Sequence, residues 1–197
     1  MVTVLVTGGI GSGKTAVSLI LSESGIPVYD SDSAVHRLYR EDEQLRSRIS
    51  AAFGPEALSP EGVDRARLSN IVFSSPRHLE LLENLVYPAL LQDFRSWQAG
   101  LGTAFSAMES AVAYEKPAFK DIFDFIIFVD APEDKRIARV CGRDGISAEE
   151  VRRRMANQKN LALQEAGAVV RNDSGLANLC KQVESALNSL YLQFGNK

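Results

Sequence analysis

Eight residues near the start of the chain constrain its fold more than any other segment. Residues 8–15 read Gly-Gly-Ile-Gly-Ser-Gly-Lys-Thr and match G-x-x-x-x-G-K-[ST], the pattern of a phosphate-binding loop. Glycines let the backbone curl tightly, so that its N–H groups point inward at a polyphosphate. In this pattern Lys14 reaches the β- and γ-phosphates, and the Thr15 hydroxyl is a ligand for Mg²⁺. An accidental glycine turn is the alternative interpretation.

The segments on either side of the loop argue against an accidental turn. Residues 2–6 form a short apolar run with β-branched members, which is typical of a buried strand. Residues 16–21 have helical character, so the loop opens a helix whose N-terminus favours anions. We therefore predict a binding site for the polyphosphate of a nucleotide and for Mg²⁺. Its predicted nucleotide-binding residues are Gly9, Gly11, Ser12, Gly13, Lys14, Thr15 and Ala16, and Thr15 is also the predicted metal ligand.

The remaining periodic segments predict an α/β fold. Strand patterns follow the loop helix at four places along the chain, at residues 26–29, 103–108, 125–129 and 168–170. Helical patterns accompany them at residues 133–141, 149–160 and 176–194, with Ser147 as a cap of the second. This order predicts a doubly wound sheet of about five parallel strands, in which ligands bind outside the carboxyl ends of the strands.

Residues 34–99 differ from this core. They contain four helical patterns and no convincing strand, which predicts a helical insertion. Ser75 is a predicted helix N-cap, with Pro76 at the first helical position.

Two carboxylates, Asp30 and Asp32, follow the second predicted strand. Phosphoryl transfer to a hydroxyl needs a carboxylate that orients the hydroxyl or takes its proton. Alternation along an extended segment would put both side chains on the same side. Turn and cap chemistry is the alternative. We assign the catalytic role to Asp32, the residue farther beyond the strand. We favour a position facing the substrate for His36, and a place on the surface is the alternative.

Arginines follow the strand at residues 125–129. The spacing of Arg136, Arg139 and Arg143 puts them on one helix face, where guanidinium groups could stabilise a transferring phosphoryl group. A solvated face paired with nearby glutamates and aspartates is the alternative, and it also applies to the run at residues 152–154.

Three further carboxylates leave more than one interpretation open. Asp130 resembles the acid that follows a Walker B strand, but we favour a cap on the next helix, with Pro132 at its start. Glu109 and Glu115 flank one segment, and either could contact Mg²⁺ through water or bind substrate.

Composition bounds the partners and the compartment. A net charge of −3 gives no global attraction to nucleic acid or an acidic membrane. Cys141 and Cys180 have no metal-ligand spacing, which favours free thiols in a reducing cytoplasm. The chain contains no long apolar run typical of a membrane span. We expect small-molecule substrates, no nucleic-acid or membrane partner, and a monomer or small homo-oligomer.

The ordered set of these motifs resembles the dephospho-coenzyme A kinase family, and the resemblance covers nearly the whole chain. The resembling segments are Thr7–Thr15, Asp30–Asp32, Phe53-Gly54, Asp64-Arg65, Leu68, Ile71–Phe73, Leu82-Glu83, Glu115, Val129–Pro132, Arg139, Arg143-Asp144, Arg154-Met155, Gln158 and Asn172. The chain departs from the family pattern at Tyr87-Pro88, Ser110–Ala113 and Ala166-Gly167.

The resemblance implies a P-loop kinase core that phosphorylates the ribose 3′-hydroxyl of dephospho-coenzyme A with ATP, the last step of coenzyme A synthesis. It implies one domain with a core at about 1–33, 100–139 and 166–197, an acceptor-binding insertion at 34–99 and a lid at 140–165. Combined with the interpretation of the residues above, the predicted catalytic residues are Lys14, Asp32, Arg139 and Arg143, and the predicted substrate-binding residues are Asp32, His36 and Glu115.

Two other functions remain open from the residues alone. Another P-loop small-molecule or nucleoside monophosphate kinase would share the loop, because the loop does not distinguish acceptors. A nucleotide-dependent switch such as a GTPase would need a guanine-reading N-K-x-D, and residues 157–160 read Asn-Gln-Lys-Asn within a predicted charged helix.

Overall fold

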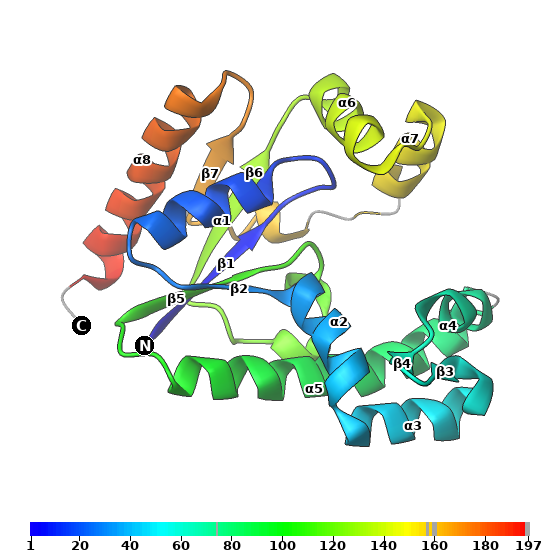
Figure 1. Cartoon of the computed structure of the whole chain (residues 1–197). Helices are drawn as coiled ribbons and strands as arrows, with labels where there is room; N and C mark the ends of the chain where they lie inside the picture. Colours follow the sequence, from blue (N-terminus) through cyan, green and yellow to red (C-terminus); the bar gives the residue numbers. More distant parts are fainter. Residues whose placement is uncertain (74, 157, 159–160, 196–197) are drawn as a thin grey trace. The chain divides into compact units, whose positions relative to one another are not determined.

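The computed structural model describes residues 1–73, 75–156, 158 and 161–195, and it contains two compact units (Figure 1). The first unit consists of Met1–Tyr29 and Gly102–Lys197, and the second of Asp30–Leu101. No helix in the described ranges is long and apolar enough to cross a membrane.

A five-stranded parallel sheet organises the first unit, with the strand order β2-β5-β1-β6-β7. Its strands are β1 (Val2–Thr7), β2 (Val28–Asp30), β5 (Phe105–Glu109), β6 (Phe125–Asp130) and β7 (Ala168–Arg171). The chain builds outward from β1 on both sides, which confirms the predicted doubly wound α/β fold.

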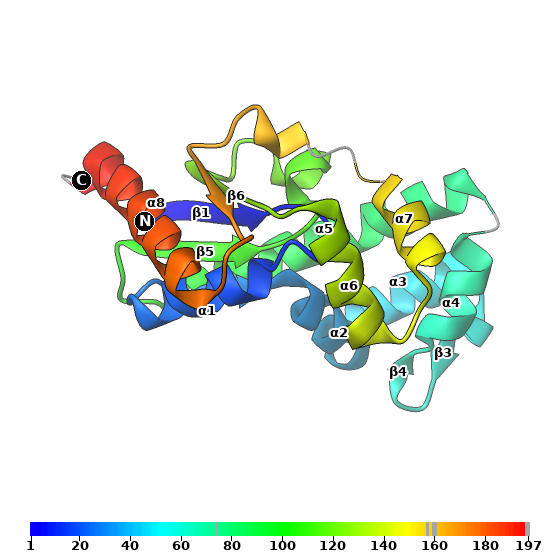
Figure 2. The ribbon, with the colours of Figure 1, turned by 90° about the horizontal axis from the view of Figure 1, so that it is seen from above.

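The helices of this unit follow its strands along the chain. They are α1 (Lys14–Glu23), α6 (Glu133–Asp144), α7 (Ala148–Ala156) and α8 (Leu176–Phe194), with 3₁₀ turns η2 (Ala113–Glu115), η3 (Pro117–Phe119) and η4 (Leu161–Leu163). α6 and α7 lie side by side in both views (Figures 1 and 2).

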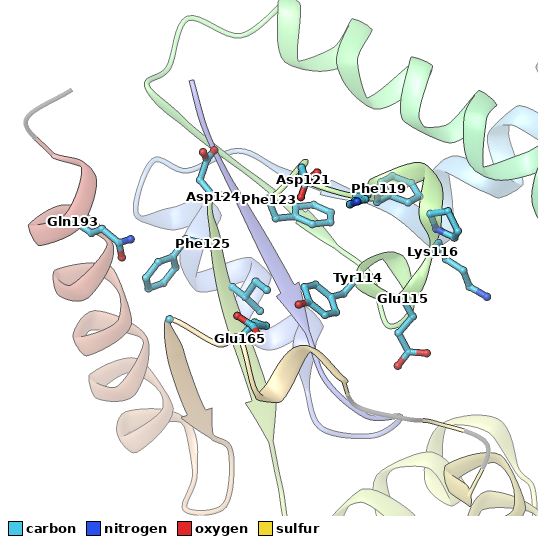
Figure 3. Close-up of a pocket in the computed structure, with 14 residues that line it drawn as sticks. Tyr114, Glu115, Lys116, Phe119, Asp121, Phe123, Asp124, Phe125, Glu165 and Gln193 are labelled. Carbon is cyan, nitrogen blue, oxygen red and sulfur yellow. The ribbon is translucent and has the colours of Figure 1, made fainter.

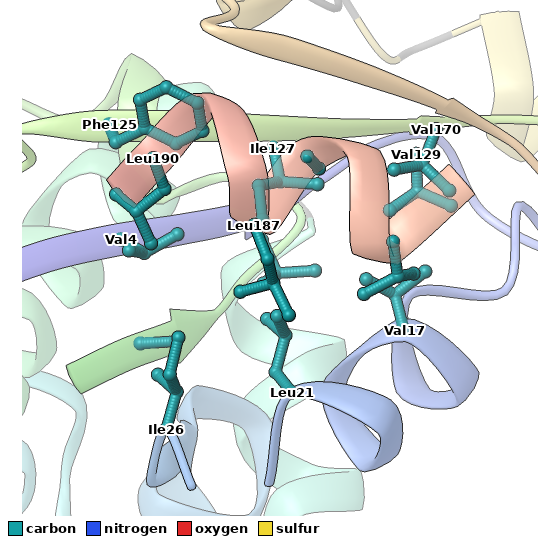
Figure 4. Close-up of a cluster of buried hydrophobic side chains, with 14 of the residues drawn as sticks. Val4, Val17, Leu21, Ile26, Phe125, Ile127, Val129, Val170, Leu187 and Leu190 are labelled. Atoms are coloured by element: carbon teal, nitrogen blue, oxygen red, sulfur yellow. The ribbon is translucent and has the colours of Figure 1, made fainter. Parts of the chain in front are cut away.

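The main apolar core lies where α1 and α8 pack on the sheet (Figure 4). Val17 and Leu21 of α1 meet Leu187 of α8 over Ile127 of β6, and all four are buried. Each such aliphatic side chain contributes about 1.5–3 kcal/mol by leaving water. This core fixes the start of α1 against β1, and so it anchors both ends of the loop that joins them.

Two local predictions in the first unit need correction. Asp130 does not cap α6, because Pro132 occupies the N-cap position and no side chain caps the helix. Asp130 instead ends β6, and its carbonyl accepts a hydrogen bond from the Asn172 N–H at 2.8 Å. The helix predicted at 149–160 is α7, which ends at Ala156, and residues 157, 159 and 160 lie outside the described residues.

Helices dominate the second unit. It contains α2 (Ser31–Glu41), α3 (Glu43–Phe53), η1 (Pro55–Ala57), β3 (Leu58–Ser59), β4 (Gly62–Val63), α4 (Arg65–Val72) and α5 (Pro76–Ala99). Its apolar core includes Leu45, Ile49 and Phe94, which are buried. A bidentate ion pair between Arg37 and Asp93, with N–O distances of 3.1 and 2.6 Å, joins α2 to α5.

The structure corrects two expectations for this unit. The segment at 34–99 is not free of strands, because β3 and β4 form a two-residue antiparallel hairpin. Strands this short have no periodicity to detect. Gly62 has a φ of 132°, and a Cβ there would lie 2.4 Å from the Tyr39 carbonyl oxygen, so the hairpin requires glycine where it meets α2.

Ser75 is the N-cap residue of α5 and Pro76 is the first residue of the helix, as predicted.

The second correction concerns the start of α2. The chain enters the helix at Ser31, directly after β2, and does not continue as an extended segment. The Asp30 carboxylate accepts hydrogen bonds from the N–H groups of Asp32 and Ser33, at 3.0 and 3.2 Å, and so caps the helix. The expected alternation of Asp30 and Asp32 along one extended face is therefore wrong.

Candidate active site

The phosphate-binding loop joins β1 to α1 at the carboxyl end of β1. Gly8, Gly11 and Gly13 have φ values of 146°, 74° and 97°, which L-residues with a side chain rarely adopt. The Lys14 ammonium arches back over the loop, with Nζ 3.1 Å from the Gly8 carbonyl oxygen. The N-terminus of α1 and a lysine charge thus come together at one place, and both favour a bound anion.

Hydrogen bonds inside the loop fix its shape. The Ser12 N–H donates to the Gly9 carbonyl at 3.1 Å, and the Ala16 N–H donates to the Gly13 carbonyl at the same distance. Ser12 is buried, and its hydroxyl makes no hydrogen bond within the described part of the chain. In this conformation the amides of Ser12 and Ala16, two of the predicted nucleotide-binding residues, therefore bond to carbonyls of the loop itself.

Thr15 lies beside a carboxylate that the sequence left undecided. Its hydroxyl donates to Oε1 of Glu109 at 2.9 Å. Glu109 is the last residue of β5, which pairs with β1, so the strand order brings it to the loop. Two oxygen donors side by side, one of them charged, suit a hard cation.

Glu115 occupies a different place. It ends η2 and lines a cavity of about 710 Å³ together with Tyr114, Phe125 and Glu165 (Figure 3). Phe125 begins β6, so the cavity lies toward the amino ends of the strands, whereas the loop lies at a carboxyl end. Among the described residues, the loop contributes none to this cavity.

Arg139 of α6 holds the loop from outside. Its guanidinium donates to the carbonyls of Gly11 and Ser12, at 3.2 and 3.1 Å, and to the carbonyl and side-chain oxygens of Asn172, at 2.9 and 3.2 Å. The Asn172 amide in turn donates to the Ser12 carbonyl at 2.9 Å. A Cβ on Gly13 would lie 2.0 Å from the Asn172 amide nitrogen, so glycine is required for this approach.

The other two arginines of this helix face, Arg136 and Arg143, differ from each other. Arg136 Nε donates to the Ile10 carbonyl at 2.9 Å, and burial lowers the pKa of its guanidinium. Arg143 forms an ion pair with Asp144 at 2.6 Å, and this hydrogen bond lowers the pKa of the Asp144 carboxyl. The structure therefore brings Arg136 and Arg139 to the loop, while the ion pair described for Arg143 is with its neighbour in sequence.

The arginine run at 152–154 is a paired, solvated helix face, as the alternative interpretation held. Arg152 pairs with Glu133 at 3.6 Å, and Arg154 pairs with Glu150 at 3.2 Å. Glu150 also pairs with Arg153.

The predicted residues of the second unit lie on α2. Asp32 is exposed in the first turn, and the capping role belongs to Asp30. His36 lines a largely apolar cavity of about 310 Å³, which Tyr39 and Arg65 also line. Burial raises the pKa of Tyr39 to about 12.

Tyr87 of α5 is close enough to Asp32 for that charge to affect its pKa. Its pKa is raised, first by burial and then by the nearby groups Glu83, Tyr39 and Asp32. Two tyrosines that stay neutral therefore lie in the same unit as the exposed carboxylate.

Sequence reasoning did not single out Glu109 or Asn172 as loop partners. Glu109 ends β5 and Asn172 directly follows β7, and both strands are far from the loop in the sequence. These residues lie close to the loop because of the order of the strands in the sheet. An acidic or amide residue at the end of each strand would have been the signal to follow.

A parallel sheet with this loop after its central strand is the core of the P-loop kinases. Two solved structures match the chain over nearly its whole length. TT1252 from Thermus thermophilus superposes with a TM-score of 0.83 and 29% identity, over 96% of this chain and 97% of that one. The dephospho-CoA kinase from Campylobacter jejuni has a TM-score of 0.68 and 22% identity, over 99% of this chain and 98% of that one, and supports the fold.

Sequence comparison then identifies the family. The family model described as dephospho-CoA kinase matches residues 2–178. A dephospho-CoA kinase from Porphyromonas gingivalis is 39% identical over 169 residues, which cover 85% of this chain and 83% of that protein. The chain belongs to the dephospho-CoA kinase family, whose activity is the ATP-dependent phosphorylation of dephospho-coenzyme A in coenzyme A biosynthesis. This assignment confirms the predicted resemblance and disfavours a kinase with another acceptor.

Proposed function

We propose that the loop at residues 8–15 binds the triphosphate of ATP and directs its γ-phosphoryl group at the 3′-hydroxyl of dephospho-coenzyme A. The observation that carries the proposal is the lysine and the helix N-terminus held together at the loop, with the Lys14 ammonium 3.1 Å from the Gly8 carbonyl. A positive charge in a fixed position stabilises the charge that develops on the phosphoryl oxygens, without reorganisation during the reaction. Lys14 is then a catalytic residue, and the loop amides hold the β-phosphate.

The Thr15–Glu109 pair supports a magnesium site. Mg²⁺ in kinases is held by one or two protein oxygens together with water and substrate phosphates, so a hydroxyl and a carboxylate 2.9 Å apart fit it. Within the described residues no larger group of histidine, cysteine and carboxylate side chains suits a metal. When bound, the ion would neutralise charge on the phosphates. Thr15 and Glu109 would hold it.

Asp32 is the proposed general base. It follows the carboxyl end of β2 by two residues, and the carboxyl ends of parallel strands face the ligand in a doubly wound sheet. The Asp32 carboxylate takes the proton of the 3′-hydroxyl, and the oxygen of that hydroxyl forms a bond to the γ-phosphorus. The bond from that phosphorus to the β–γ bridging oxygen breaks, and ADP leaves. Asp30 cannot serve equally, because its oxygens cap α2.

Arg139 and Arg143 both lie on α6, which leads into the proposed lid at residues 140–165, and we propose a different role for each. Arg139 already bonds the loop and Asn172, and it would stabilise phosphate charge from there. Arg143 would contact phosphate only after exchanging its Asp144 partner. Closure of the segment over ATP would exclude water that otherwise hydrolyses the nucleotide.

The acceptor would bind through the helical unit. The cavity lined by His36, Tyr39 and Arg65 offers apolar walls and the Arg65 guanidinium, which suits an amphipathic molecule that carries phosphate. Glu115 remains a candidate for contact with a part of the acceptor remote from the reacting hydroxyl. Free cysteines at positions 141 and 180 are in keeping with action in the cytoplasm.

A panel of acceptors tests this proposal. ADP release is measured with dephospho-coenzyme A, adenosine monophosphate, shikimate and gluconate, each at equal concentration and with Mg²⁺. We expect ADP release to depend on dephospho-coenzyme A. Equal release without any acceptor, or faster release with another alcohol, would contradict the proposal.

A further inference from the structure

Ile10, at a variable position of the phosphate-binding loop, is held on both sides of its backbone. Its N–H donates to Oε1 of Gln158 at 2.8 Å, and its carbonyl accepts from Nε of Arg136 at 2.9 Å. Arg136 belongs to α6, and Gln158 follows α7. Two residues from the α6–α7 part of the chain therefore bracket a single residue of the loop.

The Ile10 side chain packs into an apolar cluster away from the main core. The cluster is built on Ile137 and Val140 of α6 and Val151 of α7, which are 9%, 1% and 0% exposed. Ile10 is the member that comes from the loop, and Ile146 is a member from the connection between α6 and α7. An aliphatic side chain in such a cluster cannot move without opening a cavity or shifting its neighbours.

The glycines beside Ile10 permit this close packing. A Cβ on Gly9 would lie 2.2 Å from a guanidinium nitrogen of Arg136. A Cβ on Gly11 would lie 2.5 Å from the Arg136 carbonyl oxygen and 2.9 Å from Cγ2 of Val140. The absence of side chains at these positions thus serves the approach of α6, in addition to the curl of the loop.

We infer that Ile10 is a positioning residue that couples the phosphate-binding loop to the α6–α7 pair. Its side chain is anchored in the α6–α7 cluster, and its peptide groups are bonded to Arg136 and Gln158, so a change in the loop is passed to both helices. Nucleotide that orders the loop thereby holds α6 and α7 in place. By the same linkage, α6 and α7 held in place favour nucleotide binding.

This inference rests on the proposed binding of ATP by the loop, and its test separates the two. The readout is trypsin cleavage at Arg152, Arg153 and Arg154, exposed residues of α7, with and without ATP and Mg²⁺ at saturation. Binding is measured separately for each variant by fluorescence of a labelled ATP analogue, so that protection is compared at equal occupancy.

Ile10→Ala is the test variant, and Ile146→Ala is its matched control. Both remove the same atoms from the same cluster, but Ile146 lies outside the loop. A merely structural role would lower thermal stability and weaken protection alike in both variants. Ile10→Val, which keeps a branched side chain, is the conservative rescue.

For the wild type and for Ile146→Ala we expect saturating ATP to slow cleavage by about tenfold, since bound ligand suppresses opening by mass action. For Ile10→Ala we expect less than about a twofold effect at equal occupancy and a dissociation constant for ATP raised about tenfold, with Ile10→Val close to wild type. Should Ile10→Ala not fold, Gln158→Leu, which lacks an acceptor for the Ile10 N–H, is compared with Gln158→Glu, which keeps one. We expect ATP to protect Gln158→Glu about as well as the wild type, and to protect Gln158→Leu as weakly as is expected for Ile10→Ala.

Equal protection of Ile10→Ala and the wild type would overturn the inference and leave the proposed function intact. Equal loss in Ile10→Ala and Ile146→Ala would overturn it too, because the effect would then be one of packing alone. A wild type that binds no ATP would overturn the proposed function and the inference together.

Discussion

The loop region and the helical unit present their candidate residues in opposite ways. Around the loop, β5, α6 and the segment after β7 all form hydrogen bonds with residues 9–15, and Arg139 by itself donates to two loop carbonyls. At α2, the Asp30 side chain caps the start of the helix and Arg37 forms an ion pair, while Asp32 in the first turn is exposed.

The two halves of the transfer reaction thus depend on different kinds of groups. The phosphate site depends on backbone groups, whose direction requires glycines and outside support. The proposed acceptor side depends on a carboxylate displayed at a helix start, and its neighbours secure the helix. We therefore expect changes to the loop to act on ATP, and changes at Asp32 to act on the chemical step.

The largest effect should come from Lys14→Ala. We expect kcat for phosphoryl transfer to fall about 10³-fold, because a fixed charge in the transition state is removed. Steady-state kinetics with dephospho-coenzyme A measure it. Lys181→Ala, an exposed lysine on α8, is the control, and a similar fall in both variants would contradict a local role.

Asp32→Asn sharpens the comparison within one helix turn. We expect kcat to fall about 10²- to 10³-fold, with the KM for ATP little changed, because the variant loses a proton acceptor. Asp30→Asn is the matched control, since an asparagine side chain still accepts the cap hydrogen bonds. Wild-type turnover by Asp32→Asn would remove this residue from the base role.

Arg139→Ala and Arg143→Ala compare two arginines of α6. We expect kcat/KM for ATP to fall about 10²-fold for Arg139→Ala, because loop carbonyls and Asn172 lose their donor and the phosphates lose a charge. Arg143→Ala should have the smaller effect, as its ion pair is with Asp144. The reverse ranking would show that Arg143 is the main phosphate contact.

Glu109→Gln and Glu115→Gln distinguish the two carboxylates that the sequence left open. We expect the Mg²⁺ concentration for half-maximal activity to rise about tenfold for Glu109→Gln, because Glu109 accepts from Thr15. Glu115→Gln should leave the Mg²⁺ dependence unchanged. A larger shift in Glu115→Gln would place the metal elsewhere.

Tyr39→Phe gives the smallest expected effect, on stability at alkaline pH. The pKa of Tyr39 is about 12 in the fold, above its ordinary value of 10.0, so the unfolded chain loses this proton first as the pH rises. Stability is therefore full below pH 10 and falls between about 10 and 12, by at most about 1.4 kcal/mol per pH unit for one group. Urea unfolding at pH 9 and 11 measures it, and an equal loss in wild type and Tyr39→Phe would contradict the assignment.

The parts of this account that could be predicted from sequence are those with a local pattern. The loop and the apolar strands each carry their signal within a few residues, and the confirmed order of helices and strands led to the doubly wound fold. The start of α2 was missed because Asp30 caps the helix at once, and capping and catalytic carboxylates look alike in sequence.

The rest of the site depends on which strands are neighbours. Glu109 meets Thr15 because β5 pairs with β1, and Asn172 meets Ser12 because β7 pairs with β6. No short-range pattern carries these pairings. The contacts of Ile10 with Arg136 and Gln158 are of the same kind, since they depend on how α6 and α7 pack.

Phosphorus NMR of the product distinguishes phosphoryl transfer to the ribose from hydrolysis of ATP. Purified protein is incubated with ATP, Mg²⁺ and dephospho-coenzyme A, and the phosphorus spectrum is followed with time. We expect one new phosphomonoester, on the ribose 3′-oxygen, for each ADP formed. ADP with inorganic phosphate and no ester, or an ester at another position, would contradict it.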